Sequence, residues 1–121
     1  MISRKWPHIF ALVALWSAIA TAVTMALLPH PPHVFLDRFG DKVEHSTAFA
    51  VIAWLSVLAY PNARLARIGE RLSFLGALIE VAQSIPALHR DCDIFDWFAD
   101  TGAIIAALLV AWVFRRIARR G

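Results

Sequence analysis

The chain has 121 residues, of which 60% are hydrophobic, and it carries a formal net charge of +3 at pH 7. Its mean hydropathy of +0.62 lies well outside the range of ordinary soluble domains, which argues against a water-soluble enzyme. The length predicts one domain, residues 1–121. The single cysteine, Cys92, excludes an internal disulfide framework.

The first predicted element is an uncharged apolar run over residues 9–28. At about 1.5 Å per helical residue, twenty residues cross a hydrocarbon core of roughly 30 Å. A cleavable secretory signal is the alternative, because Arg4 and Lys5 precede the run. The run is longer than the apolar part of a signal, and further apolar segments follow, so we predict a retained membrane span.

Three more apolar segments are predicted to span a membrane, over residues 43–60, 72–88 and 97–114. The first of them stops at Pro61 and Asn62, a helix terminator followed by a turn former. Lipid tolerates backbone polar groups only in helices or closed barrels, and the alternation typical of barrel strands is absent. The prediction is therefore all-α: a polytopic four-helix transmembrane bundle.

The basic residues predict the orientation of this bundle. Nine of the twelve lysines and arginines fall on one side of the predicted spans: Arg4, Lys5, Arg64, Arg67, Arg71, Arg115, Arg116, Arg119 and Arg120. The other three are Arg38, Lys42 and Arg90. The positive-inside rule then places both termini in the cytoplasm. The net positive charge is a topology signal, so no nucleic-acid partner is expected.

Three of the predicted spans carry a polar stripe near the same, extracytoplasmic surface. The stripes are Asp41, His45 and Ala48; Gly76, Glu80 and Gln83; and Asp93, Asp96 and Asp100. Within each stripe the spacing puts the residues on one helix face. Glu80 lies about 9 Å inside Pro86 at helical rise. Ionisable groups at such depth face a bundle interior or a water-filled cavity, so we expect the stripes to converge.

Convergence would bring several carboxylates together. Glu80 beside the aspartates would be repelled unless a proton, a cation or a basic side chain lay between them. The available basic partners are Lys42, His45 and Arg90. If these do not suffice, the remaining routes are a carboxyl group that keeps its proton or a metal ion with oxygen and imidazole ligands.

A set of spaced polar residues extends through the second, third and fourth predicted spans. It consists of Asp41, Lys42, His45, Phe49, Glu80, Gln83, Pro86, Arg90, Asp93, Asp96 and Asp100, followed by a helix rich in glycine and alanine. Over residues 41–107 this set resembles the VanZ-like family of small bacterial membrane proteins. Many members of that family have asparagine at the position of Asp100.

The resemblance implies a multi-pass protein of the bacterial inner membrane with a link to glycopeptide (teicoplanin) susceptibility. It implies no agreed catalytic mechanism. We hypothesise that an extracytoplasmic polar pocket binds or acts on an envelope lipid or glycolipid headgroup. Glu80 and His45 are the candidates for proton transfer. The candidates for substrate binding are Asp41, Lys42, Gln83 and Arg90, and those for a divalent cation are Asp93, Asp96 and Asp100. No other cofactor is expected.

The alternative is a structural or adaptor membrane protein, whose polar network only holds the helices together and whose output is binding of a membrane-protein partner. Passage of ions or protons is disfavoured, because the cytoplasmic halves of the predicted spans carry almost no polar residues. The sequence leaves open whether the protein is an enzyme.

Overall fold

The computed structural model describes residues 5–27, 41–85 and 94–120. In these ranges the regular structure consists of four helices and no strands. The helices are α1 (Lys5–Leu27), α2 (Asp41–Ala59), α3 (Leu65–Gln83) and α4 (Ile94–Arg120). The predicted all-α fold class is confirmed.

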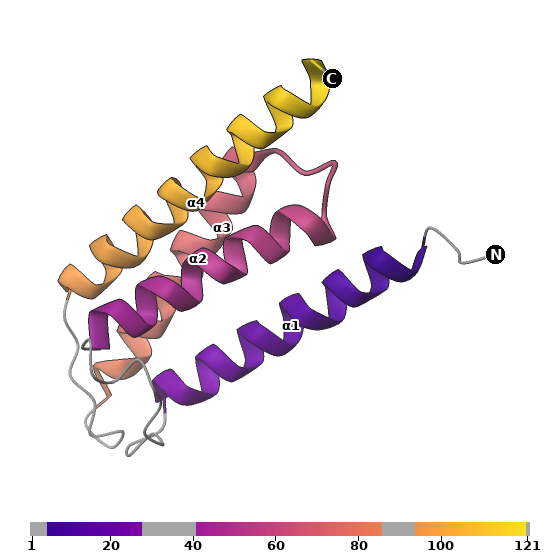
Figure 1. The fold of residues 1–121 in the computed structure, drawn as a ribbon. Helices are drawn as coiled ribbons and strands as arrows, with labels where there is room; N and C mark the ends of the chain where they lie inside the picture. The colour runs from indigo at the N-terminus through magenta and orange to yellow at the C-terminus, as the bar shows by residue number, and fades with distance from the viewer. Residues whose placement is uncertain (1–4, 28–40, 86–93, 121) are drawn as a thin grey trace.

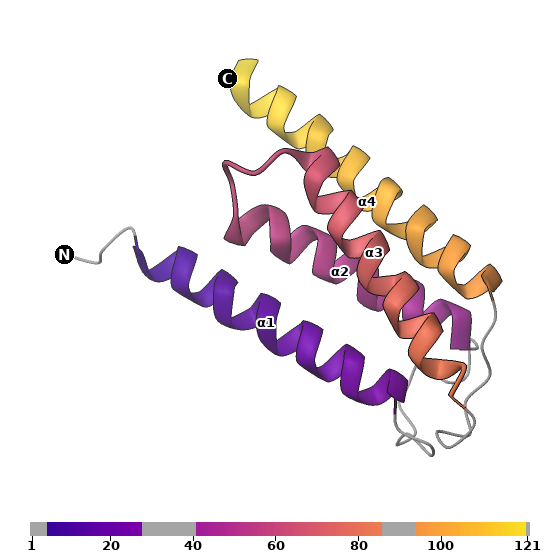
Figure 2. The ribbon, with the colours of Figure 1, turned by 180° about the vertical axis from the view of Figure 1, so that it is seen from behind.

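The four helices run alternately up and down the bundle (Figures 1 and 2). One end holds the last turn of α1, the first turn of α2, the last turn of α3 and the first turn of α4. We call this the polar end. The start of α1, the connection between α2 and α3, and the end of α4 lie together at the opposite end, which we call the basic end. Side chains from three helices can therefore meet at the polar end.

Helix α2 is the centre of the bundle, because the two most extensive helix contacts, with α4 and with α1, are both made by α2. Its inward side chains Phe49, Ile52 and Ala53 are almost completely buried. The apolar core around them draws on every helix and consists of Leu15, Ala26, Phe49, Ile52, Ala53, Ala59, Ile68, Leu72, Ile79, Ile104, Ala107 and Leu108. Burial of these side chains holds the helices side by side.

The helices differ in length from the predicted spans. Helix α3 begins at Leu65 rather than at residue 72, and α4 continues to Arg120, past residue 114. Hydropathy marks only the apolar part of a helix. A helix can continue beyond that part through turns whose charged side chains are exposed. Arg67 and Glu70, on the first turns of α3, are exposed and lie 4.0 Å apart. Helix α3 ends at Gln83 with Ser84 as its C-cap, and residues 86–88 lie outside the described part of the chain.

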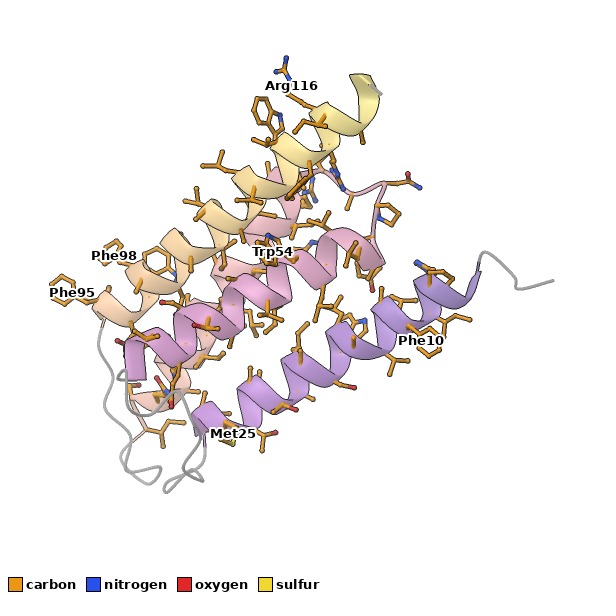
Figure 3. All side chains as sticks on the ribbon, viewed as in Figure 1. Phe10, Met25, Trp54, Phe95, Phe98 and Arg116 are labelled. Atoms are coloured by element: carbon orange, nitrogen blue, oxygen red, sulfur yellow. The ribbon has the colours of Figure 1, made fainter. Side chains whose placement is uncertain are left out.

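Two helical segments are long and apolar enough to cross a membrane: Pro7–Leu27 and Ile94–Ala118. The apolar part of α2, Val43–Ala59, is shorter. Large apolar side chains face outward all round the bundle, and Figure 3 shows Phe95 and Phe98 pointing away from α4. A contiguous apolar exterior of this kind is typical of a surface that contacts lipid or another protein.

Hydrogen bonds join α4 to its neighbours. The indole nitrogen of Trp54 donates to the carbonyl oxygen of Ala107 at 2.9 Å, and Trp54 projects from α2 toward α4 in Figure 3. The indole nitrogen of Trp97 donates to the carbonyl oxygen of Ser73 at 2.9 Å, and the hydroxyls of Ser73 and Thr101 lie 2.9 Å apart. Polar contacts of this kind hold helices together where lipid offers no hydrogen-bond partner.

The glycines Gly76 and Gly102 differ in their surroundings. A Cβ atom added to Gly76 would lie 3.4 Å from Cδ1 of Trp97 and 3.5 Å from Cζ of Phe49, so α2, α3 and α4 are closely packed there. A Cβ atom added to Gly102 would meet nothing within 4 Å. The sequence predicts close helix approach on α4 at Gly102, Ala103, Ala106 and Ala107. Ala107 is buried and accepts the hydrogen bond from Trp54 of α2, whereas Gly102 and Ala106 are exposed. On α3, the close contact with both α2 and α4 is at Gly76.

We expect Gly76→Leu to lower the free energy of unfolding by about 1–3 kcal/mol relative to Gly102→Leu, because the leucine at position 76 overpacks the bundle. Both substitutions replace a helical glycine by leucine, so the gain in helix propensity is matched. Denaturant titration of the purified protein in detergent measures the difference. Equal stability of the two variants would contradict the packing around Gly76.

Candidate polar site at one end of the bundle

Three titratable side chains meet at the polar end: His45 from α2, Glu80 from α3 and Asp100 from α4. One ligating atom from each lies within 4.8 Å of those of the other two. Glu80 is 6% exposed and Asp100 is 2% exposed, while His45 is partly buried. We call these three residues the triad.

The positions of the helix ends explain why the triad forms. His45 lies in the second turn of α2, Glu80 in the last turn of α3 and Asp100 in the second turn of α4. Because neighbouring helices are antiparallel, these three turns lie at about the same level of the bundle (Figure 1). Gly76 lies one turn before Glu80 on the same face of α3, and its missing side chain allows α2 and α4 to approach.

Gln83 connects this region to α1. Its side chain is 1% exposed, and its amide nitrogen donates to the carbonyl oxygen of Ala26 at 2.9 Å. Ala26 lies in the last turn of α1. A buried amide that caps the end of a neighbouring helix satisfies a carbonyl group that has no partner within that helix. Gln83 therefore joins α1, the helix that contributes no residue to the triad, to the polar end.

Asp96 is buried in the first turn of α4, with 6% of its surface exposed. The partial positive charge at a helix N-terminus favours a carboxylate in this position. Asp96 and Asp100 lie on the same face of α4, as the sequence predicts, but Asp96 is not a member of the triad. The site combines one aspartate from the predicted metal set, Asp100, with the two predicted proton-transfer residues.

The remaining predicted site residues are not placed by the structure. The backbone of Asp41 and Lys42 forms the start of α2, but their side chains lie outside the described part of the molecule. Arg90 and Asp93 lie outside the described residues altogether. The substrate-binding role of Asp41, Lys42 and Arg90 and the metal-binding role of Asp93 stay predictions.

The basic side chains that the structure describes are concentrated at the other end of the bundle. Arg115 donates to the carbonyl oxygen of Pro61 at 3.1 Å, and the guanidinium of Arg116 lies 4.9 Å from the ring centre of Trp112. Of the three basic partners expected for Glu80, the structure describes the side chain of His45, which lies beside it. The side chains of Lys42 and Arg90 lie outside the described part of the molecule.

An apolar groove of about 720 Å³ lies between α3 and α4. Its lining starts near the middle of the bundle, at Ser73 and Thr101, and extends toward the basic end. The lining residues are Leu65, Ala66, Gly69, Glu70, Ser73, Thr101, Ile104, Ile105, Leu108, Leu109 and Trp112. The triad does not line this groove. Its shape and lining suit a hydrocarbon chain rather than a polar molecule.

Sequence patterns predicted the triad residues but divided them between two roles, proton transfer and metal binding. The contact between Gln83 and α1 could not be predicted, because the acceptor is a backbone carbonyl, which no side chain marks in the sequence. The pairing of Ser73 with Thr101 was also missed. Its only sequence signal is a pair of small hydroxyl residues in apolar segments.

Comparisons of the chain with protein-family models, with curated protein sequences and with solved structures found no significant match.

We expect Gln83→Leu to loosen α1, because it removes the hydrogen bond to Ala26 and leaves a buried carbonyl without its donor. The expected cost is about 0.6–2 kcal/mol, the range for hydrogen bonds between membrane helices. Hydrogen exchange followed by mass spectrometry should show faster exchange in residues 22–27. Ser73→Ala is the control, since Ser73 bonds to α4. Unchanged exchange in Gln83→Leu would contradict the proposed tie.

Proposed function

We propose that this chain is a VanZ-like, four-span protein of the bacterial inner membrane. In this proposal the polar end faces the extracytoplasmic side and binds, or acts on, the headgroup of an envelope lipid or glycolipid. The observation that carries the proposal is the triad: three titratable groups from three helices lie within 4.8 Å of one another in an apolar bundle. Buried ionisable groups that converge inside an apolar bundle are typical of functional sites.

The chemistry of the triad fits recognition of a polar headgroup. An imidazole beside two carboxylates can accept a proton from a hydroxyl group or donate one to a leaving oxygen. His45 is more exposed than Glu80 or Asp100, so an entering headgroup would reach the imidazole first. We assign proton transfer to His45 and Glu80, with Asp100 orienting the imidazole. Lys42 and Arg90 would bind the phosphate or carboxylate of the headgroup.

The groove between α3 and α4 supports a lipid rather than a water-soluble substrate. Ser73 lies two helical turns from Glu80 along α3, about 10 Å at helical rise. A lipid whose headgroup sits at the triad would extend its acyl chain toward the middle of the bundle. An apolar groove of about 720 Å³ that starts near Ser73 and Thr101 could hold part of that chain.

The proposed orientation follows from the separation of charge between the two ends. Arg64, Arg67, Arg71, Arg115 and Arg116 lie at the basic end. In the positive-inside arrangement this end faces the cytoplasm. The two helices long and apolar enough to cross a membrane, α1 and α4, both have their basic flank at this end.

The orientation predicts selective labelling of the lone cysteine. A membrane-impermeant maleimide should label Cys92 in intact spheroplasts, because residues 86–93 would lie outside the cytoplasm. In a Cys92→Ser background, Ala118→Cys should be labelled only after the membrane is permeabilised. Ala118 is exposed near the end of α4. Labelling of Ala118→Cys in detergent is therefore the control, because it shows that the cysteine can react once the membrane no longer shields it. The reverse pattern would contradict the proposed orientation.

The headgroup function predicts that Glu80→Gln abolishes the effect of the protein on teicoplanin susceptibility. Removing the carboxylate charge from the triad removes the group proposed to exchange a proton, with little change in size. The measurement is the minimum inhibitory concentration in cells that express the variant, divided by the amount of protein in the membrane. For Glu80→Gln we expect the same minimum inhibitory concentration as for cells that lack the protein.

Glu70→Gln is the matched control for this experiment. It is the same substitution on the same helix, but the side chain of Glu70 is 75% exposed and lies at the basic end. It should keep the full effect. If Glu80→Gln lowers the protein level while its activity per molecule equals that of Glu70→Gln, the headgroup function is wrong.

The second candidate function is a structural or adaptor protein. The interhelical bonds from Gln83 to Ala26 and from Trp54 to Ala107 favour it, because they stabilise the bundle without a ligand. In that case Glu80→Gln would reduce stability and partner binding together. Activity per folded molecule would stay unchanged.

A further inference from the structure

The triad has the composition and spacing of a metal site. We propose that His45, Glu80 and Asp100 bind one divalent transition-metal ion, with Zn²⁺ and Mn²⁺ as the fitting ions. The three side chains come from three different helices. The ion would therefore join α2, α3 and α4 at the polar end.

The distances between the ligating atoms suit this role. Metal–nitrogen and metal–oxygen bonds to Zn²⁺ of about 2.0–2.2 Å place tetrahedral ligand atoms roughly 3.4 Å apart. The triad atoms lie within 4.8 Å of one another. The ligand atoms would therefore have to approach one another by about 1.4 Å or less to bind one ion.

Charge balance supports a cation at this position. Two carboxylates that are 6% and 2% exposed are costly to keep ionised in an apolar bundle. One divalent cation neutralises both of them.

The donor types narrow the choice of ion. Imidazole suits Zn²⁺, Fe²⁺, Ni²⁺ and Cu²⁺, whereas carboxylates suit Mg²⁺, Ca²⁺ and Mn²⁺. One imidazole with two carboxylates fits Zn²⁺ or Mn²⁺ better than Ca²⁺, which takes six to eight oxygen ligands. Three protein ligands also leave an open position, as in catalytic rather than structural zinc sites.

Gln83 provides an independent observation. Its side-chain oxygen is buried and has no hydrogen-bond partner among the described residues, while its nitrogen is held by Ala26. Gln83 lies one turn after Glu80 on the same face of α3. A buried amide oxygen in this place can accept a hydrogen bond from a metal-bound water.

This inference deepens the proposed function, and it rests on that function for the role of the ion. At the open position the ion would bind a phosphate or carboxylate oxygen of the headgroup and stabilise negative charge there. With the ion bound, this role would replace the proton transfer proposed for His45 and Glu80, whose donor atoms would then be metal ligands. Whether the protein binds a metal is measured without any substrate. Failure of the metal site and failure of the headgroup function can therefore be told apart.

The first measurement is equilibrium dialysis of the purified full-length protein in detergent, with its affinity tag removed, against Zn²⁺ and separately against Mn²⁺. Metal content is determined by mass spectrometry. We expect one equivalent of metal per chain. The variant in which His8, His30, His33 and His89 are all alanine should keep that equivalent. Pulsed electron paramagnetic resonance of its Mn²⁺ form should then detect a coordinated imidazole nitrogen from His45.

The variants His45→Ala, Glu80→Gln and Asp100→Asn should each weaken binding at least about tenfold. Glu70→Gln should bind like the wild type. Wild-type protein without bound metal, or triad variants that bind as the wild type does, would overturn the proposal. If a triad variant does not fold, the test uses the four-alanine variant, in which His45 is the remaining histidine. One bound metal ion per chain and an imidazole signal would support the metal site, and the absence of either would overturn it.

The two failures have different signatures. Metal binding that needs the triad, together with full teicoplanin effect in Glu80→Gln, would leave the metal site standing and refute the headgroup function. Loss of the teicoplanin effect in Glu80→Gln, together with no metal binding in the wild type, would refute the metal site and leave the headgroup function standing.

Discussion

The structure depends on the cost of keeping two carboxylates and an imidazole inside an apolar bundle. Glu80 and Asp100 are almost completely buried, and an isolated charge in such surroundings is prohibitively unfavourable. They can remain only if the helices that carry them stay close enough to share a proton, a cation or a basic side chain. The same electrostatic requirement therefore fixes the relative level of α2, α3 and α4 and creates the chemically distinctive part of the molecule.

Much of this arrangement could be predicted from the sequence, because helical spacing and hydropathy are local properties. The all-α class, the polar faces of α3 and α4 and the convergence of His45, Glu80 and Asp100 follow from spacing and from the cost of buried charge. The ends of α3 and α4 could not be predicted in this way. Hydropathy locates the apolar segment, whereas Arg67, Arg71 and Arg116 belong to helical turns beyond it.

The contacts that sequence patterns missed are tertiary. The tie from Gln83 to Ala26 uses a backbone acceptor, which every residue offers and no residue type marks. The close approach at Gly76 depends on that glycine facing Phe49 and Trp97, which helical spacing alone does not reveal. Packing against a specific neighbour decides both cases. That information arises only once the helices are assembled.

The unequal lengths of the helices have a consequence for the surrounding bilayer. The apolar part of α2, Val43–Ala59, is about 25 Å long at helical rise, whereas Ile94–Ala118 of α4 is about 38 Å long. A short hydrophobic segment is matched by local thinning of the bilayer, and a long one by tilting. In a membrane, α2 would draw the headgroup layer inward beside the bundle. Lipid headgroups would then approach His45 without the protein having to open.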